Sequence, residues 1–141
     1  MTPQQIQAVQ KSFVLLEPVA EPAMMMFYDR LFEMDPMMRH LFRSSREEQA
    51  KKLAQVLAMV VKSLDRPEKI LGAVKDLGRR HAGYGVTEGH YATVGAALLW
   101  TLEQGLGEAF TSEVKDGWAG AYGLLAGVMQ AAAAEGPAVA A

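Results

Sequence analysis

The sequence predicts an all-α fold. Apolar residues recur every three or four positions along most of the chain, as they do on the buried face of a helix. Residues that favour the start of a helix divide the chain into successive segments. No stretch shows the alternation of apolar and polar residues that is typical of a strand. With 50% apolar residues among 141, we expect one domain around one substantial core.

Seven positions carry the start signals, in chain order. A proline in the first turn or a small polar residue ahead of an apolar run stands at Thr2-Pro3, Glu21-Pro22, Asp35-Pro36, Ser45, Arg66-Pro67, Thr87 and Thr111. Ser45 and Glu48 have the spacing of a capping box, which predicts a long helix after Ser45. Pro18 interrupts the first helix, and the helix from Asp35-Pro36 is short. Gly83 and Gly85 end the helix that starts near Pro67, because glycine adopts helix-ending backbone angles at little cost.

Residues 1–135 are expected to form the domain, and residues 136–141 a disordered, alanine-rich tail. Residues 1–10 are polar and do not resemble a signal peptide, and no apolar run is long enough to span a bilayer. We therefore expect a cytoplasmic protein without a membrane partner. The net charge of −2 gives no reason to expect a nucleic-acid partner. The absence of cysteine excludes disulfides, thiolate metal ligands and cofactor attachment through a CxxCH motif.

His81 lies in the last turn of a predicted helix, directly before the corner formed by Gly83 and Gly85. Imidazole is the commonest metal ligand among side chains, so this position is a candidate metal site. A histidine at a helix C-terminus also interacts favourably with the helix dipole as a cation. His81 taken alone leaves both interpretations open.

The order of several features gives His81 a context. The segment FYDRLF at 27–32 is followed by Pro36, by Leu41-Phe42, by Gln49 and Leu53 one helical turn apart, by His81, and by Tyr91. This order resembles the globin family, and in particular the bacterial single-domain haemoglobins related to the haem domain of flavohaemoglobins. The most specific segments are FYDRLFEMDPMMRHLF and DLGRRHAGYGVTEGHYATVG. The resemblance extends from the first predicted helix to about Gln130.

The resemblance implies a globin fold of seven to eight helices around non-covalently bound haem b. It implies that His81 is the proximal iron ligand, that Phe42 stacks on the porphyrin, and that Tyr28 and Gln49 lie on the distal side. The other residues implied at the cofactor are Leu53, Leu77, Tyr91 and Val94, with Lys52 and Arg80 as partners of a haem propionate. We also expect the second ring nitrogen of His81 to donate to a backbone carbonyl near Leu77.

Two positions depart from the family pattern. An alignment without a gap places Lys52 at the distal position in place of Gln49. We prefer Gln49, because this choice turns Leu53 inward and avoids burying the charge of Lys52. In the last helix, the glutamate that completes a proximal network in flavohaemoglobin-type proteins matches about Ala133, and Glu135 is displaced from it. Whether Glu135 joins such a network stays open.

The resemblance implies a protein that binds oxygen reversibly, with nitric oxide and carbon monoxide as further ligands. Two hydrogen-bond donors, Tyr28 and Gln49, predict high oxygen affinity and slow release. We expect a contribution to nitric oxide detoxification by dioxygenation to nitrate, which leaves enzymatic turnover an open question. No GxGxxG follows a strand, so the reductase would be external. The alternatives are a gas-binding or sensing globin without catalytic turnover, and a haem-free helical module.

Overall fold

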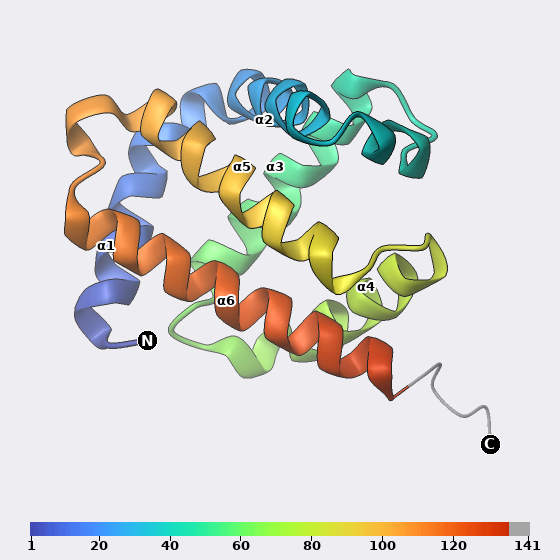
Figure 1. Cartoon of the computed structure of the whole chain (residues 1–141). Coiled ribbons are helices and arrows are strands. Elements are labelled where there is room, and N and C mark those ends of the chain that lie inside the picture. Colours follow the sequence, from blue (N-terminus) through green and yellow to red (C-terminus); the bar gives the residue numbers. More distant parts are fainter. Residues whose placement is uncertain (136–141) are drawn as a thin grey trace.

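A computed structural model describes residues 1–135, and the prediction of a disordered tail at 136–141 lies outside the described residues. The described part contains six α-helices: α1 (Pro3–Leu16), α2 (Ala20–Met34), α3 (Arg46–Lys62), α4 (Leu71–Gly83), α5 (Glu88–Leu106) and α6 (Ser112–Ala134) (Figure 1). Four short 3-10 helices connect them: η1 (Glu17–Val19), η2 (Pro36–Leu41), η3 (Pro67–Lys69) and η4 (Gly107–Ala109). No strand occurs in residues 1–135, so the all-α prediction is confirmed.

Most of the predicted start signals act as helix caps, whereas Glu21-Pro22 and Arg66-Pro67 provide no side-chain cap. The side chains of Thr2, Ser45 and Thr111 each accept a hydrogen bond from the backbone N–H three residues later, at Gln5, Glu48 and Val114. At Thr87 the cap is reciprocal, because the Thr87 N–H donates to Nδ1 of His90 over 3.0 Å. His90 therefore serves the start of α5, which agrees with its place three residues after the cap.

Two boundaries differ from the expectation. The short segment after Asp35 is a 3-10 helix, since only six residues separate Asp35 from Phe42, whose backbone is extended. The helix that carries His81 begins at Leu71, after the separate turn η3, and continues to Gly83. The expected seven to eight helices are thus six α-helices, and short 3-10 turns take the place of the others.

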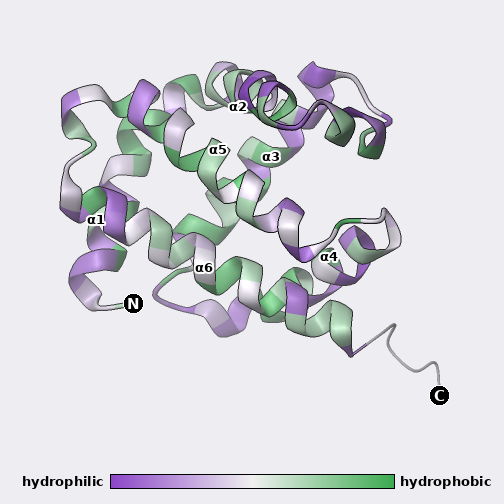
Figure 2. Cartoon of the chain, in the orientation of Figure 1, coloured by the Kyte–Doolittle hydropathy of each residue, from purple (hydrophilic) through white to green (hydrophobic). Residues whose placement is uncertain are grey.

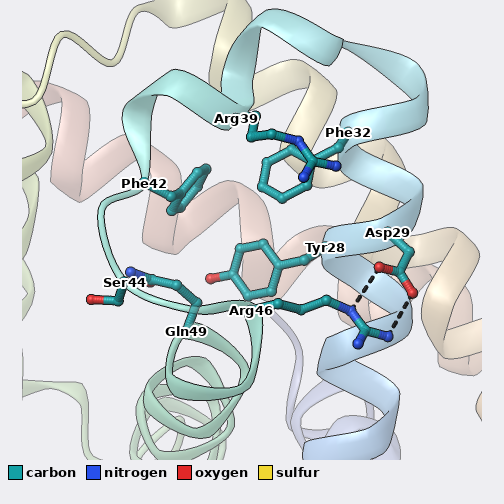
Figure 3. A pocket seen from close by; sticks show the side chains of 8 residues that line it. All are labelled: Tyr28, Asp29, Phe32, Arg39, Phe42, Ser44, Arg46 and Gln49. Atoms are coloured by element: carbon teal, nitrogen blue, oxygen red, sulfur yellow. Dashed lines mark hydrogen bonds and ion pairs between the residues drawn. The ribbon is translucent and has the colours of Figure 1, made fainter.

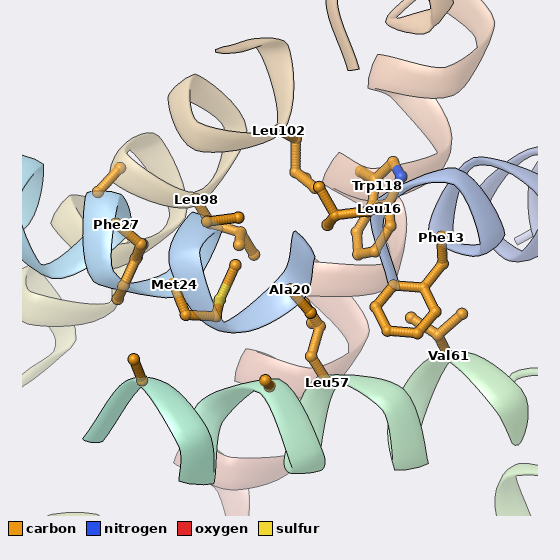
Figure 4. Packing of buried hydrophobic residues seen from close by; sticks show 14 of the residues in the cluster. Phe13, Leu16, Ala20, Met24, Phe27, Leu57, Val61, Leu98, Leu102 and Trp118 are labelled. Atoms are coloured by element: carbon orange, nitrogen blue, oxygen red, sulfur yellow. The ribbon is translucent and has the colours of Figure 1, made fainter. Parts of the chain in front are cut away.

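The core lies where α1, α2, α3, α5 and α6 meet. Its fully buried side chains include Leu16, Met24, Leu102 and Trp118 (Figure 4). The indole N–H of Trp118 donates to Ser12 Oγ over 2.8 Å, which joins α6 to α1 and leaves no buried donor unpaired at that point. Figure 2 shows α5 as mostly apolar in its middle part, with hydrophilic residues near both ends, in agreement with its central place. None of the helices in residues 1–135 combines the length and the hydropathy that crossing a bilayer requires.

The position of α4 is set by its packing on α6. The two helices approach so closely at Gly78 that a Cβ on this residue would overlap the backbone of Met129. Within residues 1–135, α4 hardly contacts α3. The helices that carry His81 and Gln49 are therefore held by separate partners, α4 by α6 and α3 by α2. The space between them is not closed by direct packing of one helix on the other.

Candidate functional site

His81 is half-buried in the last turn of α4, and its ring is fixed by the backbone. Its Nδ1 lies 2.8 Å from the carbonyl oxygen of Leu77. A carbonyl only accepts hydrogen bonds, so Nδ1 carries the proton in this contact. The expected contact with Leu77 is thus present, and it leaves the lone pair of Nε2 available to a ligand or metal.

The surroundings of His81 favour its neutral form. Burial is the largest influence and lowers the pKa of His81 below its usual value. The hydrogen bond to Leu77 acts in the opposite direction, and the positive charge of Arg80 lowers the pKa further. Neutral imidazole is the form that binds a metal, so the ring is prepared for that role without losing a proton first.

The corner after His81 has a defined geometry. Gly85 has a φ of 89°, a backbone conformation that favours glycine, and the N–H of Val86 donates back to the carbonyl of His81. The ring of Tyr84 lies 6.0 Å from the ring of His81, centroid to centroid, and is 59% exposed. Sequence reasoning did not single out Tyr84, because one exposed tyrosine in a turn carries no signal of its own.

On the other side of the site, α2 contributes Tyr28. The residue is buried, and its ring meets the ring of Phe42 edge-on, with 5.3 Å between the centroids. The Tyr28 hydroxyl points toward the side chain of Gln49 (Figure 3). Burial raises the pKa of Tyr28 to about 12. The hydroxyl therefore keeps its proton at neutral pH and is available as a hydrogen-bond donor.

A cavity of about 120 Å³ lies beside Tyr28. Three predicted site residues line it, Tyr28, Phe42 and Gln49, and the other lining residues are Asp29, Phe32, Arg39, Ser44 and Arg46 (Figure 3). Gln49 thus shares a cavity with Tyr28, whereas Lys52 is exposed. This placement favours Gln49 over Lys52 at the distal position, an assignment that stays a prediction.

The wall of this cavity contains an ion pair that the sequence analysis missed. Arg46 bonds both oxygens of the Asp29 carboxylate, from Nε and from one terminal nitrogen, each over 2.7 Å. Both side chains are partly exposed, so the pair contributes little to stability, about 0–1 kcal/mol. Its consequence is geometric, because it ties the first residue of α3 to the middle of α2. Two opposite charges 17 residues apart gave no sequence signal.

The remaining predicted residues fall into two groups by exposure. Leu53, Leu77 and Val94 are half-buried apolar side chains on three different helices. Lys52 and Arg80 are exposed, and their pairing with a propionate stays a prediction. Apolar side chains left half-covered, next to helices that do not pack on each other, fit a large apolar group such as haem. Nε2 of the neutral His81 is the predicted nitrogen ligand of such a group, an assignment that stays a prediction.

Tyr91 lies in the first turns of α5, and its hydroxyl is buried without a hydrogen-bond partner in the described part of the chain. Burial raises the pKa of this hydroxyl. Glu135, the residue after α6, is exposed and does not bond this hydroxyl. The carbonyl of Tyr91 accepts a hydrogen bond of 2.6 Å from the hydroxyl of Tyr122, which burial keeps protonated by raising its pKa. Tyr122 in turn lies against Gly95, where a Cβ would come within 2.8 Å of its ring.

The Tyr122 contact gives a testable expectation about the link between α5 and α6. We expect Tyr122→Phe to lower the free energy of unfolding by about 1 kcal/mol, because it removes one partly buried hydrogen bond and little else. Urea unfolding followed by circular dichroism measures the change. Tyr84→Phe is the matched control, since Tyr84 is 59% exposed, and it should leave the unfolding midpoint where it is. Equal effects of the two substitutions would show that the 2.6 Å contact contributes nothing.

Comparison with known proteins places these features in a family context. A family model described as Globin matches residues 25–129. The flavohemoprotein of Bordetella pertussis is 37% identical over 106 residues, which cover 73% of this chain and 26% of that protein. The flavohemoprotein of Vibrio cholerae is 29% identical over 131 residues, which cover 91% of this chain and 33% of that protein. The chain thus spans about a quarter to a third of the length of these relatives.

Two solved structures are similar over nearly the whole chain. An engineered carbene transferase, a candidate nitric oxide dioxygenase, from Rhodothermus marinus superposes with a TM-score of 0.88 at 29% identity. The match covers 96% of this chain and 94% of that one. A bacterial globin from Campylobacter jejuni superposes with a TM-score of 0.84 at 26% identity, and the match covers 95% and 97% of the two chains.

Proposed function

This chain belongs to the globin family, and from that premise we propose that it holds haem b without a covalent bond, binds oxygen tightly and supports nitric oxide detoxification. The observation that carries the proposal is the hydrogen bond from His81 to Leu77, which leaves Nε2 of a neutral imidazole unprotonated. Bound haem supplies an iron centre with one coordination position open to a diatomic gas. Nε2 of His81 is the atom of this chain that would hold the iron.

The distal side chains support tight gas binding. Tyr28 keeps its phenolic proton and can donate it to a polar ligand beside the ring. Gln49 lines the same cavity and offers an amide N–H as a second donor. Phe42 lies edge-on against Tyr28 and limits the directions that the phenol can take. Two donors that already face one small space lose little freedom when a ligand arrives, so release of the ligand is slow.

Nitric oxide detoxification is the finer part of the proposal. One nitric oxide, one oxygen molecule and one electron combine to give one nitrate ion. The electron must come from a reductase, and we propose an external flavin-containing partner, because the relatives at 37% and 29% identity are flavohemoproteins. The role of this chain in the reaction is to bind oxygen, orient it with Tyr28 and Gln49, and exclude bulk water with the surrounding aromatic rings.

Two measurements test this proposal in sequence. Absorption spectra of the purified protein, in the ferric, reduced, oxygenated and carbon monoxide forms, should show about one haem per chain and a stable oxygenated form. Nitric oxide consumption with a supplied reductase and reductant should then continue over many turnovers and yield nitrate. Consumption that stops after one equivalent would favour a gas-binding or sensing globin instead. If the protein takes up no supplied haem, the interpretation as a haem-free helical module is favoured.

The contribution of Tyr28 has its own test. We expect Tyr28→Phe to speed oxygen release roughly 5- to 30-fold, because it removes one hydrogen bond of about 1–2 kcal/mol. The ring and its contact with Phe42 remain, so the fold is unaffected. Oxygen dissociation followed by stopped flow in the presence of carbon monoxide measures the rate. Tyr84→Phe is the control for a tyrosine outside this cavity, and an unchanged rate in Tyr28→Phe would remove Tyr28 from gas binding.

A further inference from the structure

The cavity beside Tyr28 has a part that gas binding does not use. Its walls contain two guanidinium groups, from Arg39 and Arg46, and one carboxylate, from Asp29. A diatomic gas is uncharged and needs none of them. The formal charge of the ionisable side chains on the wall is one positive unit, so the cavity attracts anions more than cations.

The two arginines differ in what they already bind. Arg46 uses Nε and a terminal nitrogen on Asp29, so the carboxylate occupies its fork. Arg39 has no acidic partner within residues 1–135. Its guanidinium carbon lies 5.0 Å from the ring centroid of Phe32, over the face of the ring (Figure 3). A guanidinium held against an aromatic ring is positioned by that contact, and its N–H groups stay available to an acceptor.

The size and shape of the cavity narrow the ligand class. A volume of about 120 Å³ suits a group of a few heavy atoms. Guanidinium presents parallel N–H donors that match two oxygens of a planar oxyanion. The aromatic rings of Phe32 and Phe42 form flat apolar walls beside the donors. These features fit a small, planar, singly charged oxyanion better than a tetrahedral, doubly charged one.

We propose that this cavity binds nitrate or a similar planar oxyanion, with Arg39 as its main ligand and the side-chain amide of Gln49 as a second donor. This identification rests on the proposed function, in which nitrate is the product formed beside Tyr28 and Gln49. Both of these residues line the cavity, so the product would reach Arg39 without crossing the core. Asp29 does not occupy Arg39, because its ion pair within residues 1–135 is with Arg46 and none is formed with Arg39.

Nuclear magnetic resonance titration of the ferrous carbon monoxide form, which is diamagnetic, tests the site. Sodium nitrate is added at constant ionic strength, with sodium chloride and sodium sulfate as comparison salts. We expect saturable shifts of the Arg39 Nε–H and the Gln49 side-chain amide with nitrate, and only small linear shifts with chloride or sulfate. If the protein takes up no haem, the same titration applies to the protein as purified. If the protein binds nitrate but does not turn over nitric oxide, the oxyanion site is supported and the proposed function is contradicted.

Matched variants locate the ligand. Arg39→Met removes the charge and the fork but keeps an unbranched apolar stem, and we expect it to weaken nitrate binding roughly tenfold or more. Arg39→Lys keeps the charge without the fork and should restore only part of the affinity. Arg43→Met is the control, because Arg43 is exposed on the same corner and does not line the cavity. The proposal is overturned if no nitrate saturation occurs in the unmodified protein, or if Arg43→Met weakens binding as much as Arg39→Met.

Discussion

The His81→Ala variant is expected to retain almost no haem after purification, whereas the unmodified chain retains about one haem per chain. The substitution removes the half-buried imidazole of α4, whose Nδ1 is bonded to the carbonyl of Leu77 and whose Nε2 is left free. The ratio of haem absorbance to protein absorbance measures the result directly. The expected loss is nearly complete, which makes this the largest single effect in the molecule.

The design includes a control and a rescue. His90→Ala removes a histidine nine positions further on, and we expect normal haem content with a small loss of stability, because His90 only caps α5. His81→Gly with added imidazole should regain haem, since free imidazole can occupy the space of the missing ring. Full haem retention by His81→Ala, with a spectrum like that of the unmodified protein, would mean that another residue is the ligand.

The Gly78→Ala variant is expected to have a free energy of unfolding about 1–3 kcal/mol lower than that of the unmodified protein, and to lose haem faster. A single added methyl group would overlap the Met129 backbone, so α4 must move away from α6. His81 lies three residues after Gly78 on the same helix and would move with it. Thermal unfolding and the rate of haem transfer to a scavenging apoprotein measure the two effects.

Gly72→Ala is the matched control for this prediction. It makes the same substitution in the first turns of the same helix, where nothing lies within 4 Å of the added Cβ. We expect it to be neutral or to stabilise the protein by up to about 1 kcal/mol, because alanine favours the helix. If both variants behaved alike, the approach of α4 to α6 at Gly78 would not be tight in solution.

Much of the fold could be predicted because it depends on local chemistry. The side chains of Thr2, Ser45 and Thr111 accept from the backbone N–H three residues later, and the sequence displays that spacing directly. At Thr87 the roles are reversed, since the backbone N–H donates to the side chain of His90. The predicted start of the His81 helix near Pro67 is wrong, because local chemistry alone does not decide this boundary. A proline can begin a 3-10 turn as well as an α-helix, and only tertiary packing decides between them.

The candidate site also combines contacts that the sequence predicts with contacts that it does not. The hydrogen bond from His81 to Leu77 spans four residues of one helix, so it could be anticipated from the sequence. The ion pair of Arg46 with Asp29 and the contact of Gly78 with Met129 join residues far apart in the chain. No periodicity or spacing marks such pairs, because they depend on how the helices are placed. The arginine side of the cavity was therefore found only in the structure.

The low burial of the side chains on α4 has a thermodynamic consequence. Of its 13 residues only Val74 and Gly78 are buried, while α5 buries six side chains or backbone positions along its length. Most side chains of α4 thus stay at least partly exposed, although the helix packs closely on α6. Any group that binds Nε2 of His81 and covers Leu77 adds the burial that this helix lacks. The ordering of α4 is then thermodynamically linked to binding of the prosthetic group. Part of the binding free energy stabilises α4 against local unfolding.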